Sequence, residues 1–337
     1  MRALLCNALG SPDDLVETTD WTPVGPGLTG DGSKAGALSP QAVRIAVKAA
    51  GVNFADGLFI AGKYQVKPTP PFVPGFEVAG DVLEVGAEVT HVAPGDRVMA
   101  VLDQGGWAEE AIAAGADVLP LPEKMDYETA AGFPITHGTS HFGLWDRCNL
   151  QPGEVLVVHG AAGGVGLTAV ECGKAMGATV IATAGGPEKL AVALEHGADH
   201  GIDYKTQDVR AEVKRLTGGR GADVVYDPVG GEIFDASVRS TAPDGRILVV
   251  GFASGTVPSP AANILLVKNI SVIGFQWGPY RTLRPQALAA SLQQCLDWWA
   301  EGKIRPLIGR TFPLTEAAQA IKALRDRCVA GKIVLVP

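Results

Sequence analysis

The chain has 337 residues, of which 47% are hydrophobic and 19% charged, and its formal net charge is −8 at pH 7. This length suits two domains, and the composition is that of a compact enzyme rather than a disordered chain. The negative charge argues against a nucleic-acid partner. No apolar run approaches the roughly 18 residues of a membrane helix, which argues against a membrane partner.

Cysteine usage predicts a reducing compartment. The five cysteines are widely spaced and form no Cys-x-x-Cys pair; they are Cys6, Cys148, Cys172, Cys295 and Cys328. Such spacing indicates reduced thiols, without a disulfide framework or a structural zinc. The apolar N-terminus is short and soon interrupted, which predicts a first strand and no signal peptide. We therefore expect a cytoplasmic protein.

The first part of the chain has the pattern of an irregular, mostly β domain. Short alternating apolar runs occur at 44–52 and 78–86, and turn signals such as Pro94-Gly95-Asp96 separate them. Few helices are expected in such a sequence. We place this domain at residues 1–124, with a Gly-rich surface loop at 25–36.

From about residue 127 strands alternate with helix-length segments, which predicts a parallel, doubly wound Rossmann sheet over residues 125–268. The region 269–337 adds a last sheet strand, a helix and a strand that returns to the first domain. The expected strands are 155–159, 179–182, 222–226, 246–250, 270–274 and 331–336, and helices are expected from Gly164, at 188–196 and at 285–299.

A glycine turn directly after the strand at 155–159 is the most specific motif. Its spacing is Ala161-x-Gly163-x-x-Gly166, with Gly164 and Val165 between the last two positions. Strand, glycine turn and helix in this order bind the pyrophosphate of a dinucleotide, because the glycines allow close backbone approach and the helix N–H groups face the anion. The alternative is a purely structural turn.

The end of the second strand indicates which dinucleotide is bound. An NAD-preferring enzyme has an acidic residue there, but this chain has Ala184 and Gly185. Small residues and a cation suit a 2′-phosphate instead. Lys189 is the expected cation, with the Tyr204 hydroxyl beside it, although a solvated helix lysine is the alternative for Lys189. The sequence therefore favours NADPH over NADH.

The chain resembles members of the medium-chain dehydrogenase/reductase superfamily, and within it the zinc-free, zeta-crystallin-like quinone oxidoreductases. The resemblance covers nearly the whole chain and implies an α/β fold with a Rossmann domain and a GroES-like, mostly β catalytic domain. The matching segments are 50–56, 73–80, 94–98, 151–154, 161–166, 197–199, 227–231 and 331–332.

The residues at the zinc positions predict a metal-free enzyme. Zinc-dependent members of the superfamily have cysteine where this chain has Asn53, and histidine where it has Phe76. A catalytic zinc needs three protein ligands, and neither an amide nor a phenyl ring supplies one of the usual types. The region after Arg97 also lacks the cysteines of a structural zinc lobe. We expect no metal site.

The resemblance also implies roles for individual residues. Thr139 is expected beside the nicotinamide, Asn53 is expected to face the cofactor from the β domain, and Tyr64 is expected to line the cleft. Tyr64 is either a proton donor or a pocket-lining aromatic, and Gln65 stands where relatives often have proline. Further cofactor contacts are expected from Val229, Gly251, Phe252, Phe275 and, at the phosphates, Lys332.

Together these features predict an NADPH-dependent reductase of quinones or related α,β-unsaturated carbonyls. Hydride transfer leaves negative charge on the substrate oxygen, and hydrogen bonds from Asn53, Tyr64, a ribose hydroxyl or water must stabilise it in place of zinc. We expect this small-molecule substrate in a cleft between the domains. The alternatives are an enoyl or acryloyl thioester reductase on the same scaffold, or an NADPH-binding protein without turnover.

The strand at 270–274 is predicted to form an open edge of the sheet. Pairing of two such edges would produce a homodimer, which is common in the family that the chain resembles.

Overall fold

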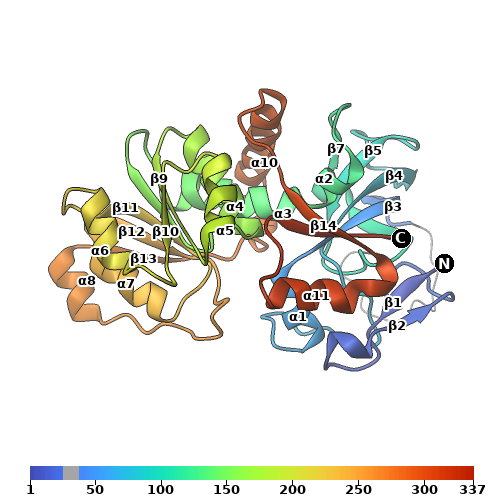
Figure 1. Cartoon of the computed structure of the whole chain (residues 1–337). Coiled ribbons are helices and arrows are strands. Elements are labelled where there is room, and N and C mark those ends of the chain that lie inside the picture. The colour runs from blue at the N-terminus through green and yellow to red at the C-terminus, as the bar shows by residue number, and fades with distance from the viewer. Residues whose placement is uncertain (26–37) are drawn as a thin grey trace. The chain divides into compact units, whose positions relative to one another are not determined.

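Two large β-sheets organise the chain in a computed structural model, and each belongs to its own unit (Figure 1). The structure describes residues 1–25 and 38–337, so nearly all of the loop expected at 25–36 lies outside the described residues. One unit comprises Met1–Ile135 and Pro306–Pro337, and the other comprises Thr136–Arg305.

The first unit contains a seven-stranded sheet in the order β14-β15-β3-β4-β5-β7, with β6 paired to β3. Near the N-terminus, β1 and β2 form a separate two-stranded antiparallel sheet. The strands are β1 (Ala3–Leu5), β2 (Val16–Thr18), β3 (Ala42–Val52), β4 (Glu77–Val85), β5 (Arg97–Val101), β6 (Glu110–Ala114), β7 (Val118–Pro120), β14 (Ile308–Pro313) and β15 (Lys332–Val336).

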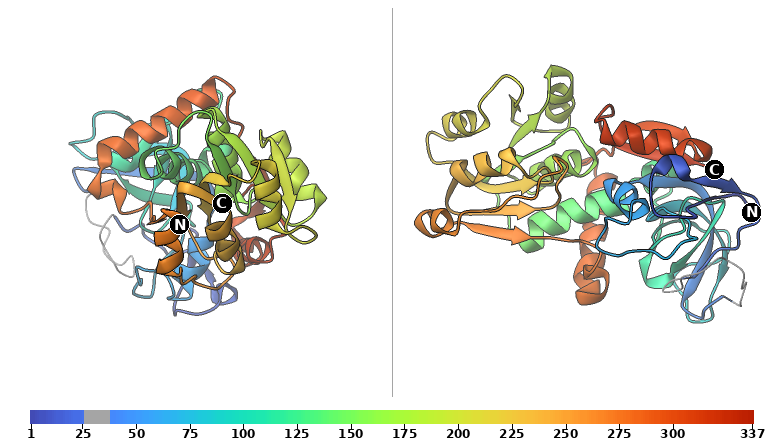
Figure 2. Two further views of the ribbon diagram at one scale, coloured as in Figure 1. Left: turned by 90° about the vertical axis from the view of Figure 1, so that its left-hand side faces the viewer. Right: turned by 90° about the horizontal axis from the view of Figure 1, so that it is seen from below.

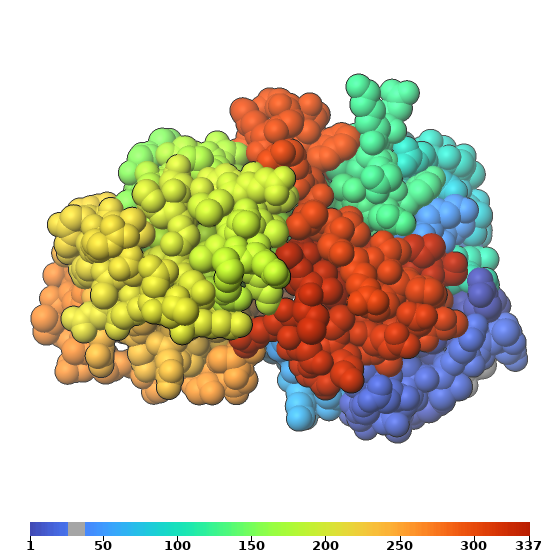
Figure 3. All heavy atoms as spheres, in the orientation of Figure 1, coloured from blue at the N-terminus to red at the C-terminus, as the bar shows by residue number. Residues whose placement is uncertain are grey.

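The C-terminal segment completes this sheet. β15 is antiparallel to β3, with Val334 opposite Gly51, so the last strand returns to the first unit as expected. In Figure 3 the residues after 306 cover one face of this unit. The helices of the unit are η1 (Pro12–Asp14), α1 (Phe54–Ile60), η2 (Gly115–Asp117), α2 (Tyr127–Ala131), η4 (Leu314–Glu316) and α11 (Ala317–Arg325).

The core of the first unit is aliphatic and aromatic. Ile45, Val78 and Val98 from three neighbouring strands have no exposed surface, and Trp107 is equally buried. Alternating burial along β3 explains the period-two pattern of its sequence, because successive side chains of a strand point to opposite faces. This apolar packing holds the strand ends from which the polar side chains described below project.

The second unit contains a six-stranded parallel sheet in the order β10-β9-β8-β11-β12-β13. This is the order of a doubly wound Rossmann sheet, and it confirms the predicted fold class. Figure 2 shows helices on both faces of the sheet. The strands are β8 (Val155–Val158), β9 (Thr179–Ala184), β10 (His200–Asp203), β11 (Ala222–Asp227), β12 (Thr241–Val249) and β13 (Ser271–Gly274).

The helices of this unit follow the alternation expected of a doubly wound fold. They are α3 (Pro134–Phe142, which starts at the unit boundary), the π-helical turn η3 (Gly143–Arg147), α4 (Gly164–Ala175), α5 (Pro187–Glu195), α6 (Val209–Leu216), α7 (Glu232–Ser240), α8 (Ala262–Lys268), α9 (Tyr280–Leu283) and α10 (Pro285–Ala300). Over the described ranges, no helix is long and apolar enough to cross a membrane.

A buried carboxylate fixes α4, the helix that follows the glycine turn. Glu171 on this helix is 3% exposed, and its Oε1 accepts hydrogen bonds from the His196 ring at 2.7 Å and from the Arg305 backbone N–H at 2.9 Å. Its Oε2 lies 3.7 Å from His137. Burial by itself raises the pKa of Glu171, but the interactions with His137 and His196 outweigh burial and lower that pKa to about 2. Glu171 is therefore a charged anchor for the helix.

Candidate functional site

The turn between β8 and α4 has the geometry that its sequence predicts. Gly160 has a φ of +59°, and its carbonyl accepts a hydrogen bond from the Gly163 N–H at 2.9 Å. Ala161, which takes the place of the first glycine of the motif, has a buried side chain and donates its N–H to the Thr183 carbonyl at 3.0 Å. Ala161 is not among the residues of positive φ. Its position therefore does not require glycine.

The other two glycines of the motif differ in what surrounds them. A Cβ on Gly166 would overlap the carbonyl group of Gly160, whereas a Cβ on Gly163 would meet the Gly160 oxygen only at 3.4 Å, an ordinary contact. Gly166 is therefore needed for close packing of the helix against the end of the strand. Gly163 leaves room for something outside the protein, as expected where a pyrophosphate approaches the backbone.

The first turn of α4 is suited to an anion. Its N-cap residue, Gly163, offers no side-chain acceptor, and the turn carries no acidic residue. The first N–H groups of a helix have no partner within the helix, and the helix dipole favours negative charge at this end. Gly164, Val165 and Gly166 supply these groups, so the turn can bind a phosphate without an opposing charge.

The loop after β11 lies at the neighbouring strand end, where the order of the sheet reverses. The Asp227 carboxylate accepts hydrogen bonds from the N–H groups of Val229 at 2.7 Å and Gly230 at 2.9 Å, and its second oxygen is buried without a partner. Gly251 donates its N–H to the Asp227 carbonyl at 3.4 Å. Phe252 follows with 36% of its surface exposed. Ligands of doubly wound sheets bind at such a switch point.

The end of β9 presents a cation and a hydroxyl where an NAD-binding enzyme has an acid. Ala184 is buried, and a Cβ on Gly185 would lie 2.6 Å from the Tyr204 hydroxyl and 3.1 Å from Cε of Lys205. Glycine at 185 is therefore required by the approach of Tyr204. Lys189 lies in the first turn of α5.

Lys205 is a further cation beside Gly185 that the sequence reasoning did not name. It follows Tyr204 directly after β10, and β10 pairs in parallel with β9, so the two strands end side by side. Its backbone N–H donates to Asp203 at 3.0 Å, and the same carboxylate oxygen accepts from Gly186 at 3.0 Å. Asp203 thus holds the Gly185–Gly186 turn against the Lys205 segment.

Thr139 lies on α3, which is fixed to the glycine turn. The hydroxyl of the next residue, Ser140, donates to the Val165 carbonyl at 2.9 Å and lies 2.7 Å from the Thr168 hydroxyl. Thr139 itself is 7% exposed. The second unit therefore brings α3 close to the start of α4, and the expected place of Thr139 beside the nicotinamide stays a prediction.

Phe275 belongs to an aromatic cluster of the same unit. It stacks on Phe142 with ring centroids 6.1 Å apart and an interplanar angle of 9°, and it lies 5.7 Å from Tyr280. Phe275 is 8% exposed. Its expected approach to a nicotinamide stays a prediction.

In the first unit, Asn53 caps α1 at the end of β3 and lies within a buried polar network. Its Oδ1 accepts from the Lys332 ammonium at 2.5 Å, and its Nδ2 donates to Glu77 Oε1 at 3.0 Å. Lys332 and Glu77 form an ion pair at 2.6 Å and are 6% and 0% exposed. The Lys332 ammonium, expected at the cofactor phosphates, therefore has two partners inside the first unit, and its role at the phosphates stays a prediction.

A second carboxyl group holds the backbone of Asn53. Asp56 is fully buried, and its Oδ2 accepts the Asn53 backbone N–H at 2.7 Å, while its Oδ1 has no hydrogen-bond partner. Burial raises the pKa of Asp56 to about 7, although the Asn53 hydrogen bond and the charge of Lys332 oppose the shift.

Tyr64 lies in an aromatic cluster with the residue that replaces the zinc-binding histidine. Its ring centroid is 5.9 Å from that of Phe76 and 6.4 Å from that of Phe59, and it is half-buried. Phe76 thus supports the Tyr64 ring. In the described part of the chain, no group of three His, Cys, Asp or Glu side chains could hold a metal ion.

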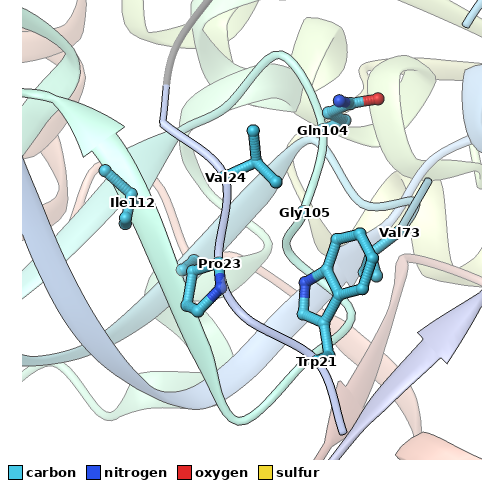
Figure 4. A pocket seen from close by; sticks show the side chains of 8 residues that line it. Trp21, Pro23, Val24, Val73, Gln104, Gly105 and Ile112 are labelled. Carbon is cyan, nitrogen blue, oxygen red and sulfur yellow. The ribbon is translucent and has the colours of Figure 1, made fainter. Parts of the chain in front are cut away.

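A pocket elsewhere in the first unit contains none of the predicted site residues (Figure 4). Its lining is mainly apolar, and Gln104 contributes the polar side chain labelled there. The lining residues are Trp21, Pro23, Val24, Val73, Gln104, Gly105, Ala111 and Ile112. None of the described residues that line this pocket is charged or titratable.

Two family models match the chain. Residues 39–123 match the alcohol dehydrogenase GroES-like domain, and residues 164–293 match the model described as zinc-binding dehydrogenase. A quinone oxidoreductase-like protein 2 homolog from Nematostella vectensis is 39% identical over 340 residues, covering 99% of this chain and 88% of that protein. A quinone oxidoreductase from Pseudomonas aeruginosa is 36% identical and covers 98% of each chain.

Solved structures show the same similarity. A quinone oxidoreductase from Pseudomonas syringae matches with a TM-score of 0.90 and 33% identity, covering 100% of this chain and 99% of that chain. The Escherichia coli quinone oxidoreductase complexed with NADPH matches with a TM-score of 0.90 and 29% identity over 100% of both chains. The CurK enoyl reductase matches with a TM-score of 0.85 and 27% identity, over 99% of this chain and 98% of that chain.

Substitution of Gly163 or Gly166 by alanine should distinguish an effect on dinucleotide binding from an effect on stability. We expect Gly163→Ala to keep the melting temperature but weaken dinucleotide binding at least tenfold, because the added methyl group occupies the space of the pyrophosphate. Gly166→Ala should lower the melting temperature, since its Cβ overlaps Gly160. Calorimetry and a fluorescence titration measure both effects. Gly278→Ala, with nothing near its Cβ, is the control. Unchanged binding in Gly163→Ala would contradict the assignment.

Proposed function

Because the chain belongs to the zinc-free quinone oxidoreductase branch of the medium-chain dehydrogenase/reductase superfamily, we propose that it uses NADPH to reduce quinones or related conjugated carbonyls. The proposal rests on the end of β9. Tyr204 and Lys205 adjoin Gly185 there, and neither Ala184 nor Gly185, at the position of the NAD-binding acid, is acidic. A carboxylate there would bind the 2′-hydroxyl of NAD and repel a 2′-phosphate.

The residues present fit the bound form of this cofactor. The open space at Gly163 and the uncapped N-terminus of α4 suit a pyrophosphate, and the Lys205 ammonium with the Tyr204 hydroxyl suits a 2′-phosphate. We assign Lys189 to the same phosphate, and Val229, Gly251 and Phe252 to the rest of the nucleotide. When bound, NADPH supplies the hydride for the reaction.

Three polar groups are proposed to act on the nicotinamide and the substrate. Thr139 orients the nicotinamide, and Phe275 packs near it. Asn53 donates a hydrogen bond to the substrate oxygen, on which negative charge develops during hydride transfer. Tyr64 lines the substrate site. Quinones need little further help, because their reduced forms are intrinsically stabilised.

An enoyl reductase is the second candidate, and Tyr64 favours it. Reduction of an enone or enoyl thioester needs a proton donor for the enolate that forms, and a half-buried tyrosine held by Phe59 and Phe76 could act as one. The fold similarity to the CurK enoyl reductase is compatible with this chemistry on the same scaffold.

We further propose a homodimer formed through the second unit. β13 ends the six-stranded sheet and pairs with β12 on one side. The neighbouring helix α8 has no buried residue, and its Leu266 and Val267 are 76% and 75% exposed. An unpaired edge beside exposed apolar side chains favours pairing with a second copy.

We also propose a reducing, cytoplasmic location for the protein. The described cysteines are all free thiols, which is in keeping with it.

Removal of the proposed phosphate ligands should change cofactor preference. We expect Lys205→Met to weaken NADPH binding about tenfold or more, since hydrogen bonds to charged groups contribute roughly 1.5–3 kcal/mol. NADH binding should not change, because NADH lacks the 2′-phosphate. Fluorescence titrations with both cofactors measure this. Lys303→Met, at an exposed lysine of the same unit, is the control. A preference of the unaltered protein for NADH would contradict the proposal.

Tyr64→Phe should distinguish the two candidate functions. Phenylalanine keeps the packing against Phe59 and Phe76 but removes the hydroxyl. If Tyr64 is a general acid, enone and enoyl thioester reduction should fall about 100-fold, while quinone reduction is largely retained. The rates of NADPH oxidation with a panel of quinones, enones and acyl thioesters measure this. Equal rates for the variant and the unaltered protein would assign Tyr64 to packing alone.

A charge on α8 should dissociate the proposed dimer. We expect Val267→Glu to sediment as a monomer, because burial of an unpaired carboxylate in an interface is strongly unfavourable. Val66→Glu introduces the same charge at a 63% exposed position of the first unit and should leave the mass unchanged. A monomeric unaltered protein in sedimentation equilibrium would contradict the pairing.

A further inference from the structure

The Asn53 carboxamide lies between a buried cation and a buried anion. Its oxygen accepts from the Lys332 ammonium at 2.5 Å, and its nitrogen donates to Glu77 at 3.0 Å. Its backbone N–H is bound by Asp56 at 2.7 Å, and its backbone carbonyl accepts the Asp56 N–H at 3.0 Å. Among the described residues, none accepts the second N–H of the amide. One donor of Asn53 therefore remains for a ligand.

The two charges determine which way the amide faces. An ammonium group can only donate hydrogen bonds, and an ionised carboxylate can only accept them. A rotation that exchanged the amide oxygen and nitrogen would place N–H against Lys332 and oxygen against Glu77, so both hydrogen bonds would become repulsions. A neutral pair of partners, such as two hydroxyls, would allow both orientations. The ion pair therefore gives the carboxamide a single orientation.

The surrounding backbone is adapted to this pair. A Cβ on Gly51 would overlap the Glu77 side chain, and a Cβ on Gly132 would lie 2.7 Å from Cγ of Lys332. The second oxygen of Glu77 accepts the Ile135 backbone N–H at 3.0 Å. Both side chains thus occupy space that two glycines leave free, and the carboxylate has a partner for each oxygen, as a buried charge requires.

We propose that Lys332 and Glu77 are positioning residues that orient the Asn53 carboxamide, so that its remaining N–H donates to the negatively charged oxygen of the reduced substrate. This inference rests on the proposed function, in which Asn53 contacts that oxygen. The ammonium also polarises the amide through its oxygen, which strengthens the N–H as a donor. The reverse orientation would present the amide oxygen to the substrate and repel the charge that develops there.

In this arrangement Lys332 orients Asn53 and does not bind the cofactor phosphates. Lys332 is 6% exposed, and its ammonium already has Glu77 and Asn53 as partners. Loss of Lys332 should therefore affect turnover and leave the affinity for NADPH unchanged. A phosphate ligand would show the opposite pattern.

A double-mutant cycle tests the proposal. Lys332→Met alone leaves an unpaired buried carboxylate, which endangers folding, so the test variant is Lys332→Met with Glu77→Gln. In the presence of Asn53 this pair of changes should lower kcat about tenfold or more, since an unoriented donor loses transition-state stabilisation. In an Asn53→Ala background the same changes should alter kcat by less than about twofold, because the residue through which they act is gone.

Several outcomes would overturn the proposal. An equal loss of kcat in both backgrounds would show that the ion pair acts independently of Asn53, and an unchanged kcat in the first background would show that orientation does not matter. A weaker NADPH affinity in the test variant would indicate that Lys332 binds the cofactor phosphates instead. The control is Arg2→Met with Glu109→Gln, which removes an exposed ion pair of the same unit and should leave kcat unchanged.

A spectroscopic measurement is independent of activity. The ¹⁵N-labelled side-chain amide of Asn53, assigned by the loss of its signals in Asn53→Ala, should give two N–H signals in the unaltered protein, and the N–H bound to Glu77 should exchange slowly with solvent and be shifted from the position of a free amide. In Lys332→Met with Glu77→Gln these signals should move toward those of a free amide. Identical signals in both proteins would overturn the positioning role. If no quinone or enone is reduced, the proposed function fails, and the signals still show whether the ion pair orients the amide.

Discussion

The buried ion pair between Glu77 and Lys332 is the interaction on which the placement of the Asn53 side chain depends. Removal of two charges from water is costly, and the attraction between them compensates only when every remaining hydrogen-bonding group has a partner. The fold meets this requirement with groups from distant segments: the Asn53 amide after β3 and the Ile135 N–H at the start of α3. The antiparallel pairing of β15 with β3 brings Lys332 to this network.

The second unit depends on a different constraint, the contact between Gly166 and Gly160. No side chain fits between the start of α4 and the end of β8, so the helix lies close to the sheet and its N–H groups face the end of the strand. This constraint concerns residues six positions apart in one turn. Because it is local, the sequence motif was sufficient to predict the strand, the turn and the helix, and the alternation of the later segments predicted a parallel, doubly wound sheet.

The same reasoning explains what the sequence did not disclose. Lys332 lies 279 positions from Asn53 along the chain, and no local pattern indicates that their side chains meet. Its neighbour Gly331 belongs to a recognisable motif, but the motif does not state where the ammonium points. Lys205 was missed for a related reason. The expected cation, Lys189, lies in the helix that follows β9, and Tyr204 was expected beside it, whereas parallel pairing of β9 and β10 also places Lys205, the residue after Tyr204, beside Gly185. Which residue of β10 lies next to Gly185 depends on strand register, which composition and periodicity leave open.

If the Asn53 amide acts on the substrate oxygen as proposed, the presence of Asn53 and Phe76 at positions where zinc-dependent relatives have metal ligands explains why the amide needs an ion pair. A metal ion attracts a negatively charged oxygen whichever way its ligands are turned, because its charge is spherically symmetric. An amide attracts that oxygen only through its N–H groups and repels it through its carbonyl oxygen, so its value for catalysis depends on orientation. A protein that uses an amide in place of a cation must therefore fix that amide, and a cation on one side with an anion on the other does so. Phe76 has a matching role, since its ring occupies the former ligand position and supports Tyr64. Asn53 and Phe76 therefore belong to one change. A metal ion attracts the substrate oxygen from any direction, whereas hydrogen-bond donors must be oriented by the fold.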